Sequence, residues 1–296
     1  MSLYNLFTQG EWIQLLLLLS YSISFSLLGT FLFLKKKTMI ANAISHTVLF
    51  GIALLFIGMK VFSGQTYFTL LSLNIGIYVL VSIITALITI FLIEILKRVI
   101  HLNSDASTAL VFSTLFSLGV ILITMFTQSS HVGVDIIMGN IDLIHIDDLK
   151  IGMMILVLST LFISVFFKEL VVISFDETFS HFSSKKPMIV QCAFLCLTSL
   201  SITCGFRYIG IAPVLGLISI PPVTASLYAR NVKELIYYSV VSNILISILS
   251  IALTKMIYEK LGVGLSTSGT LVTLHFFLLL FLLRKKGRQI HIEAQE

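Results

Sequence analysis

The sequence predicts an all-α fold, a polytopic membrane bundle of about eight or nine spanning helices. Hydrophobic residues make up 57% of the 296 residues and charged residues only 11%, whereas a soluble domain carries roughly a quarter charged residues. The mean hydropathy is +1.05. This composition leaves no room for a soluble catalytic domain, so we expect a single transmembrane domain over residues 1–296.

The apolar residues form runs long enough to cross a hydrocarbon core about 30 Å thick, which takes about 20 helical residues. Short polar segments separate the runs. The runs lie at 11–34, 41–58, 67–96, 106–127, 151–173, 187–206, 209–220, 235–257 and 267–284. The first ten residues lack a basic region and a small-residue cleavage site, so we expect the first run to be retained as a span.

Basic residues gather in alternate connections between these runs. The clusters are Lys35–Lys37, Lys97–Arg98, Lys185–Lys186, Arg230–Lys233 and Arg284–Arg288. Cytoplasmic connections of membrane proteins carry an excess of Lys and Arg. We therefore expect this side to be cytoplasmic, with the N-terminus outside and the C-terminus inside. The net charge of +5 then reflects topology, and we expect no nucleic-acid partner.

Polar side chains at membrane depth are costly and usually face a bundle interior or a cavity, so they are the functional candidates. Asn42 and His46 are four residues apart in the second run, and a helix would place both on one face. An imidazole beside an oxygen donor suits Zn²⁺, Mn²⁺ or Fe²⁺, which makes the pair a candidate transit site for a divalent cation. A polar pair that joins two packed helices would show the same pattern.

Asp105 stands at the start of the run at 106–127. Ser104 can cap that helix and Asp105 favours its N-terminus electrostatically, so capping explains the pair without a role in a pathway.

Glycine and proline interrupt the segment 208–225. The residues concerned are Gly210, Pro213, Gly216, Pro221 and Pro222. An interior proline removes a backbone donor and clashes with the preceding turn, so we expect a broken helix that lines a pathway or acts as a hinge. We expect residues 226–234 to form a short cytoplasmic helix.

The longest connection on the other side, residues 127–150, mixes apolar and acidic residues. Its acidic residues are Asp135, Asp142, Asp147 and Asp148. We expect a short helix at the outer surface, and a re-entrant segment is the alternative.

In their order along nearly the whole chain, these segments resemble the permease subunit of ABC importers for zinc, manganese and iron. Residues 41–51, ANAISHTVLFG, are similar to the family pattern G-D-A-L/I-S/A-H-x-x-L-x-G, with Asn42 in place of the family's aspartate. Residues 104–119 resemble its D-A/S/T-x-x-G-I/V-x-F-S/T stretch. Residues 138–149 resemble its L-F-G-N/D-I/L followed by D-L.

Two further stretches also resemble the family. Phe175, Asp176 and Glu177 begin a segment similar to its F-D-P-E-x-A loop, with Glu177 where proline is usual. Residues 218–225, ISIPPVTA, resemble L-x-I-P-A-A-x-A, which in the family leads into the helix that docks on the ATPase.

The resemblance implies a type II ABC importer permease, similar to the vitamin B12 importer, in the bacterial inner membrane. It implies a second permease copy or paralogue, a separate ATPase that binds ATP, an extracytoplasmic metal-binding protein, and a transported zinc, manganese or iron ion with no permanently bound cofactor. This chain has no G-x-x-x-x-G-K-S/T phosphate loop, so we expect it to be a transporter subunit and not an enzyme, with ATP hydrolysed by the separate partner chain.

The resemblance also implies that membrane lipid surrounds the chain. It further implies roles for particular residues. The implied metal pathway contains Asn42, Ser45 and His46. The implied ATPase contact contains Ser226, Tyr228, Arg230, Asn231, Lys233 and Glu234. The implied docking surface for the binding protein contains Asp135, Asp142, Asp147 and Asp148.

Three alternatives remain open at this point. An ion-coupled secondary carrier would usually show inverted repeats and paired intramembrane carboxylates, and neither is visible. The same architecture could carry a metal chelate. An intramembrane enzyme could use His46, Asp105 or His275 as acid, base or metal ligand.

Overall fold

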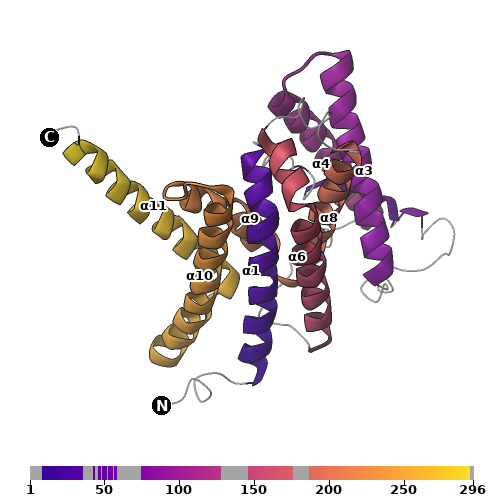
Figure 1. The fold of residues 1–296 in the computed structure, drawn as a ribbon. Coiled ribbons are helices and arrows are strands. Elements are labelled where there is room, and N and C mark those ends of the chain that lie inside the picture. The colour runs from indigo at the N-terminus through magenta and orange to yellow at the C-terminus, as the bar shows by residue number, and fades with distance from the viewer. Residues whose placement is uncertain are drawn as a thin grey trace. The chain divides into compact units, whose positions relative to one another are not determined.

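The computed structural model describes residues 9–35, 75–127, 146–175 and 187–293, together with residues 43, 46–47, 49–51, 53–55 and 57–58. Every regular element in these residues is helical, which confirms the all-α prediction (Figure 1). The helices are α1 (Gln9–Leu34), α3 (Ile75–Val99), α4 (Ser104–Thr127), α6 (Ile146–Phe175), α8 (Pro187–Tyr208), α9 (Ile211–Ser226), α10 (Val232–Leu261) and α11 (Thr267–Glu293).

Six of the helices in the described residues are long and apolar enough to cross a membrane. They fall in α1, α4, α6, α8, α10 and α11, each on a predicted run. α9 is also apolar but shorter. Since the run at 41–58 is only partly described and residues 67–74 lie outside the described residues, the number of spans stays a prediction.

The chain divides into two compact units. The first consists of residues Met1–Lys35, Asn140–Lys185 and Tyr208–Glu296, and so contains α1, α6, α9, α10 and α11. The second consists of Lys36–Gly139 and Lys186–Arg207, and so contains α3, α4 and α8. The expectation of one membrane domain over 1–296 stays a prediction.

In the first unit α1 packs against α6, α9 and α10, and Figure 1 shows it between α6 and α10. Its large apolar side chains, such as Tyr21, Phe25 and Phe31, are fully buried. Its small polar residues are buried as well, because Ser24 Oγ and Thr30 Oγ1 donate to the carbonyl oxygens one turn earlier, at 2.8 and 2.7 Å. α1 can therefore bury these small hydroxyl groups with their donors paired within the helix.

The segment 208–225 is interrupted, as predicted, but at Gly210 and not at its prolines. Residues 211–226 form one continuous helix that contains Pro221 and Pro222. Pro213 lies in its first turn, where a missing backbone donor does little harm. The interruption lies earlier, at Gly210, whose φ of 98° and ψ of 166° are accessible almost only to glycine.

Neighbouring groups explain why two prolines do not break α9. A proline at 221 cannot donate to the carbonyl of Leu217, and that oxygen instead lies 3.3 Å from the side-chain nitrogen of Asn243 on α10. In a membrane, a proline is tolerated in a helix where another group pairs with the freed carbonyl. The sequence rule failed here because it considers α9 alone.

The connection between α9 and α10 corrects the prediction of a short helix at 226–234. α9 ends at Ser226, residues 227–231 form a turn, and α10 begins at Val232. The Asn231 side chain accepts a hydrogen bond from Glu234 N at 2.8 Å, and Glu234 Oε1 accepts one from Asn231 Nδ2 at 2.8 Å. This reciprocal cap fixes the start of α10 inside the segment.

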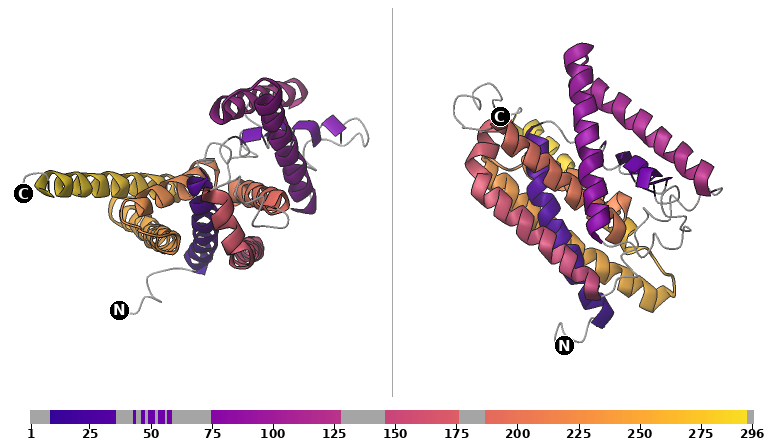
Figure 2. Two further views of the ribbon diagram at one scale, coloured as in Figure 1. Left: turned by 45° about the horizontal axis from the view of Figure 1, so that its top comes forward. Right: turned by 90° about the vertical axis from the view of Figure 1, so that its right-hand side faces the viewer.

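In the second unit α3 and α4 are joined through residues 100–103 and separate toward their other ends (Figure 2). The described residues between 43 and 58 are helical, and several of them contact both helices. Two glycines permit the close approach. A Cβ added to Gly51 would overlap Thr85 on α3, and one added to Gly119 on α4 would come within 2.8 Å of the Phe50 backbone nitrogen.

Gly29 provides a test of the packing between α1 and α9. A Cβ at this position would overlap the backbone carbonyl oxygen of Ile218, whereas a Cβ at Gly10 meets nothing within 4 Å. We expect Gly29→Ala to destabilise the protein by about 1–3 kcal/mol, as overpacking does. Gly10→Ala, in the same helix, should be neutral or slightly stabilising. Thermal unfolding of the purified chain in detergent measures both, and equal midpoints would contradict this packing.

Candidate functional site

The structure places His46 in a half-buried position against α4. The centroid of its imidazole ring lies 5.2 Å from that of Phe112 and 5.5 Å from that of Phe116. The two phenylalanines are one helical turn apart and their rings contact each other, so they form one aromatic surface. This surface restricts the orientation of the imidazole from one side.

The residues next to His46 fix its helix against α3. Thr47 and Thr89 are both buried, and Thr89 Oγ1 lies 2.9 Å from Thr47 Oγ1. Gly51, the last residue of the ANAISHTVLFG stretch, packs directly on Val81 and Thr85. The stretch that carries His46 is therefore held between α3 and α4 by a hydroxyl pair, an aromatic surface and a glycine contact.

The other residues of the predicted metal pathway, Asn42 and Ser45, lie outside the described residues. Among the residues that the structure describes, no three His, Cys, Asp or Glu side chains gather closely enough to hold a metal ion. His46 can supply one nitrogen ligand, and the oxygen partner expected at Asn42 stays a prediction.

Asp105 does not contact His46. It lies exposed in the first turn of α4, about two helical turns or roughly 10 Å along the axis from Phe112. There its carboxylate favours the positive end of the helix dipole. Ser104 is the first residue of the helix itself, and Thr108 Oγ1 donates to its carbonyl oxygen at 2.7 Å. The capping position therefore falls before Ser104.

The predicted acidic docking surface is only partly described. Asp135 and Asp142 lie outside the described residues, while Asp147 and Asp148 belong to the start of α6. The last five residues of the segment 127–150, which we expected at the outer surface, therefore belong to the long helix α6. Phe175 is the last residue of α6 and is exposed, and Asp176 and Glu177 lie outside the described residues.

The residues of the predicted ATPase contact are described and lie close together. Tyr228, Arg230, Asn231 and Lys233 are exposed, and Ser226 and Glu234 are half-buried. Glu234 Oε2 also accepts from the backbone nitrogen of Arg230 at 2.9 Å. The turn is thus an ordered, partly basic surface between two helices.

A second polar cluster lies inside the first unit, centred on Asn243. This residue is fully buried in α10. Its side-chain nitrogen lies 3.0 Å from Ser22 O and 2.5 Å from Ser26 Oγ, both on α1, in addition to its contact with Leu217 O on α9. Nearby, the Ser22 and Ser247 hydroxyls are 2.7 Å apart. One carboxamide thus joins α1, α9 and α10.

His275 extends this cluster to α11. It is fully buried, and its Nε2 lies 2.7 Å from Asn243 Oδ1. Because the carboxamide nitrogen faces the carbonyls of Ser22 and Leu217, Oδ1 is the acceptor and His275 Nε2 carries a hydrogen. The other ring nitrogen, Nδ1, lies 3.0 Å from the carbonyl oxygen of Leu271. A neutral ring with its hydrogen on Nε2 donates to Asn243 alone, so this bond is the one that ties His275 to the cluster.

Sequence reasoning missed Asn243 although a signal was present. Asn243 is a polar residue in the middle of the apolar run 235–257 and Leu217 lies four residues before Pro221, so its carbonyl lacks a partner in its own helix. A proline inside one run leaves a carbonyl without a donor, and a carboxamide inside another run needs hydrogen-bond partners. Each observation predicts that a partner exists, but only the fold shows that the two groups bond to each other.

The architecture and these sites define a polytopic α-helical membrane protein with a histidine-bearing helix in one unit and a polar centre in the other. The sequence profile described as the ABC 3 transport family matches residues 9–286. The chain therefore belongs to this family of ABC transporter permeases, and the resemblance seen in its motifs is confirmed.

Curated relatives agree with this assignment. A "Probable metal transport system membrane protein" of Chlamydia trachomatis is 34% identical over 262 residues, covering 88% of this chain and 80% of the relative. The "Manganese transport system membrane protein MntD" of Bacillus subtilis is 30% identical over 258 residues, covering 82% of each chain. These matches support a role in metal transport.

A solved structure shows the same fold. The structure titled "PsaBC from Streptococcus pneumoniae in complex with Fab" is similar to this chain with a TM-score of 0.74 and 24% sequence identity. The similarity covers 93% of this chain and 91% of the other. It confirms the all-helical bundle fold.

The Asn243 cluster makes a prediction about stability. Asn243→Leu, which keeps the volume but removes both polar atoms, leaves His275 Nε2 and the Leu217 carbonyl without a partner. We expect a loss of about 1–3 kcal/mol, measured as a lower midpoint of thermal unfolding in detergent. Ser242→Ala is the control, because the Ser242 hydroxyl donates only within its own helix, to Ser239 O.

A second substitution tests the cause. Pro221→Ala restores a backbone donor for the Leu217 carbonyl, so the combined variant should lose less stability than the sum of the two single variants. Strict additivity would show that Asn243 does not act through the carbonyl freed by Pro221.

Proposed function

We propose that this chain is the membrane-spanning subunit of an ATP-driven importer of a divalent transition metal, namely zinc, manganese or iron. Membership of the ABC 3 transport family over residues 9–286 carries this proposal, and it favours the importer over a secondary carrier or an intramembrane enzyme. Two such subunits would enclose the pathway, with a separate ATPase and an extracytoplasmic metal-binding protein as partners.

His46 is the proposed metal contact of this pathway, with Asn42 and Ser45 as neighbouring oxygen donors. The observation that supports it is an imidazole on a helix held between α3 and α4, where the aromatic rings of Phe112 and Phe116 restrict its orientation. Asn42 is neutral, so the site would hold a cation less tightly than one with a carboxylate. Weak binding suits a transit site, because the ion must also leave.

Replacing His46 tests this assignment. We expect His46→Ala to reduce uptake of radioactive manganese or zinc by cells, or by vesicles that contain the complete importer, by at least about tenfold. Thermal stability and assembly with the ATPase should be retained, because His46 is only half-buried.

The matched control is His101→Asn, in the exposed connection between α3 and α4. His101 has a φ of 56°, which asparagine also tolerates, so this change removes an imidazole without straining the backbone. If the His46→Ala variant took up as much metal as the His101→Asn control, His46 would not be the metal contact.

The turn at 227–231 with the first turn of α10 is the proposed ATPase contact. Its support is an ordered surface on which Arg230 and Lys233 are exposed and Glu234 closes the cap of α10. With this surface in the cytoplasm, the N-terminus would lie outside and the C-terminus inside the bacterial inner membrane, and the acidic residues near the start of α6 would face the binding protein.

Charge reversal tests the contact. We expect Arg230→Glu with Lys233→Glu to weaken binding of the ATPase subunit and to lower transport-coupled ATP hydrolysis several-fold, because complementary charges hold such interfaces in register. Lys260→Glu is the control, since Lys260 is exposed at the opposite end of α10. Unchanged coupling in the double variant would place the ATPase elsewhere.

A further inference from the structure

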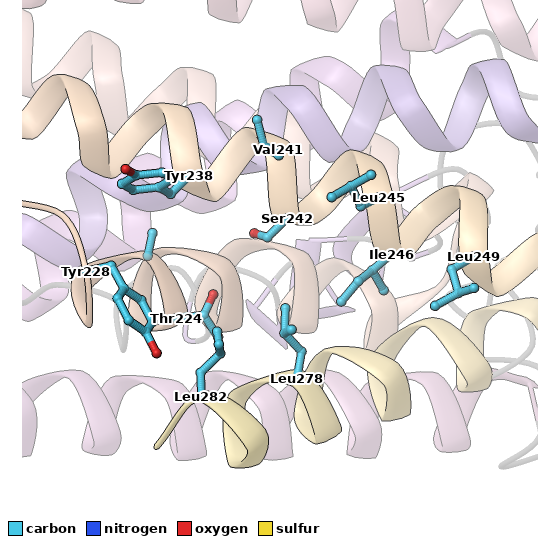
Figure 3. A pocket seen from close by; sticks show the side chains of 11 residues that line it. Thr224, Tyr228, Tyr238, Val241, Ser242, Leu245, Ile246, Leu249, Leu278 and Leu282 are labelled. Carbon is cyan, nitrogen blue, oxygen red and sulfur yellow. The ribbon is translucent and has the colours of Figure 1, made fainter. Parts of the chain in front are cut away.

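A groove of about 590 Å³ lies between α9, α10 and α11, all within the first unit (Figure 3). Most of its lining is aliphatic, with Leu245, Leu249 and Leu278 among the lining residues. Its volume falls within the usual range for binding sites of small ligands, about 300–1,000 Å³. The metal pathway proposed above does not use this groove.

The walls of the groove suit an apolar occupant. Apart from the two tyrosines at one end, the hydroxyl groups that line it belong to Thr224 and Ser242, and both donate within their own helices. Thr224 Oγ1 donates to Pro221 O at 2.7 Å, and Ser242 Oγ donates to Ser239 O at 2.9 Å. An occupant with hydrogen-bonding groups along its length would therefore find few partners, whereas a hydrocarbon chain loses nothing.

The length of the groove matches one leaflet of a bilayer. Its lining on α10 extends from Tyr238 to Leu249, three turns of helix or roughly 16 Å of rise. The hydrocarbon core is about 30 Å thick, so one leaflet accounts for about 15 Å. An acyl chain in the groove would run from the membrane surface to the middle of the bilayer.

One end of the groove is polar. Tyr228 and Tyr238 lie together at this end, opposite Leu249 (Figure 3), and both are exposed. Tyrosine is enriched where the hydrocarbon region meets the headgroups. The tyrosines therefore place this end at headgroup level and the remaining lining among the acyl chains.

The polar end also carries positive charge. Lys286 lies one turn beyond Leu282, which lines the groove, and its Nζ donates to Leu227 O at 2.7 Å, next to Tyr228. An ammonium group has three hydrogens, so Lys286 can bind a further acceptor. Arg284 and Lys285 on α11 and Arg230 in the turn at 227–231 are also exposed. Basic residues at headgroup level attract anionic lipids.

We propose that this groove is a binding site for an anionic phospholipid, with one acyl chain between α10 and α11 and the headgroup phosphate at Lys286, Tyr228 and Tyr238. A second copy of this chain is less suited to the groove, because a two-fold contact there would bring two sets of basic residues together. A bound lipid would fill the space between α10 and α11 next to the turn that we propose as the ATPase contact.

Native mass spectrometry of the full chain in detergent, titrated with phosphatidylglycerol or phosphatidylcholine, tests this proposal. The wild type should bind one phosphatidylglycerol more tightly than phosphatidylcholine, and Lys286→Gln should reduce this preference about fivefold, the effect of one basic residue near an anionic lipid. Lys285→Gln is the matched control, since Lys285 is the adjacent exposed residue of α11, and it should change the preference less.

Filling the groove is the second arm. Leu245→Trp places a bulky side chain in the middle of the groove at an exposed position, and it should weaken binding of both lipids at least about tenfold. Ile248→Trp, at an exposed position of α10 outside the lining, should bind as the wild type does.

Two results would overturn the proposal. One is equal binding of both lipids by the wild type, Lys286→Gln and Leu245→Trp. The other is a change from dimer to monomer in Leu245→Trp with lipid binding unaltered, which would make the groove an interface between copies. Metal uptake is not the readout, so failure of the proposed transport function would leave this test unaffected.

Discussion

The hydrogen bond between Asn243 and the Leu217 carbonyl is the constraint on which the first unit depends. Pro221 removes the donor that would pair with this carbonyl inside α9, and hydrocarbon offers no water as a substitute. The carboxamide of Asn243 fills this role at 3.3 Å and at the same time bonds to Ser22 O and His275. A single buried side chain thereby sets how α1, α9, α10 and α11 pack on one another.

The second freed carbonyl of the same helix packs against a glycine of a neighbouring helix. Pro222 frees the carbonyl of Ile218 in the way that Pro221 frees that of Leu217. Gly29 on α1 packs directly against this oxygen, at a distance that no Cβ could occupy. Small residues at helix contacts are typical of membrane bundles, where backbones must approach closely for van der Waals packing. The two prolines and their two partners therefore form one matched surface.

Most of the helical architecture could be predicted from the sequence, because each span is a local property of about 20 residues. The runs at 11–34, 187–206 and 267–284 lie within α1, α8 and α11. The errors arose where the outcome depends on a neighbour. The prolines of α9 are accommodated by α10 and α1, and the expected helix at 226–234 is divided because the Asn231–Glu234 cap starts α10 within it.

At the candidate site, the residue type and spacing of Asn42 and His46 predict a cation site, and this stays a prediction. The structure supplies the reason for Gly51, which contacts α3 too closely for any side chain. What the sequence could not provide was the aromatic surface of Phe112 and Phe116, because these residues look like ordinary core residues of α4. Only the packing of one helix on another shows that they face an imidazole.

These features also restrict where the proposed importer can bend. With the Leu217 carbonyl bonded to Asn243 and the Ile218 carbonyl packed against Gly29, α9 is continuous from Ile211 to Ser226. Its ends differ. At one end Gly210 adopts a backbone conformation that other residues avoid, next to the boundary between the two units in the chain. At the other end lies the capped turn proposed to meet the ATPase. We propose that a push on that turn is transmitted along α9 as a whole and absorbed at Gly210.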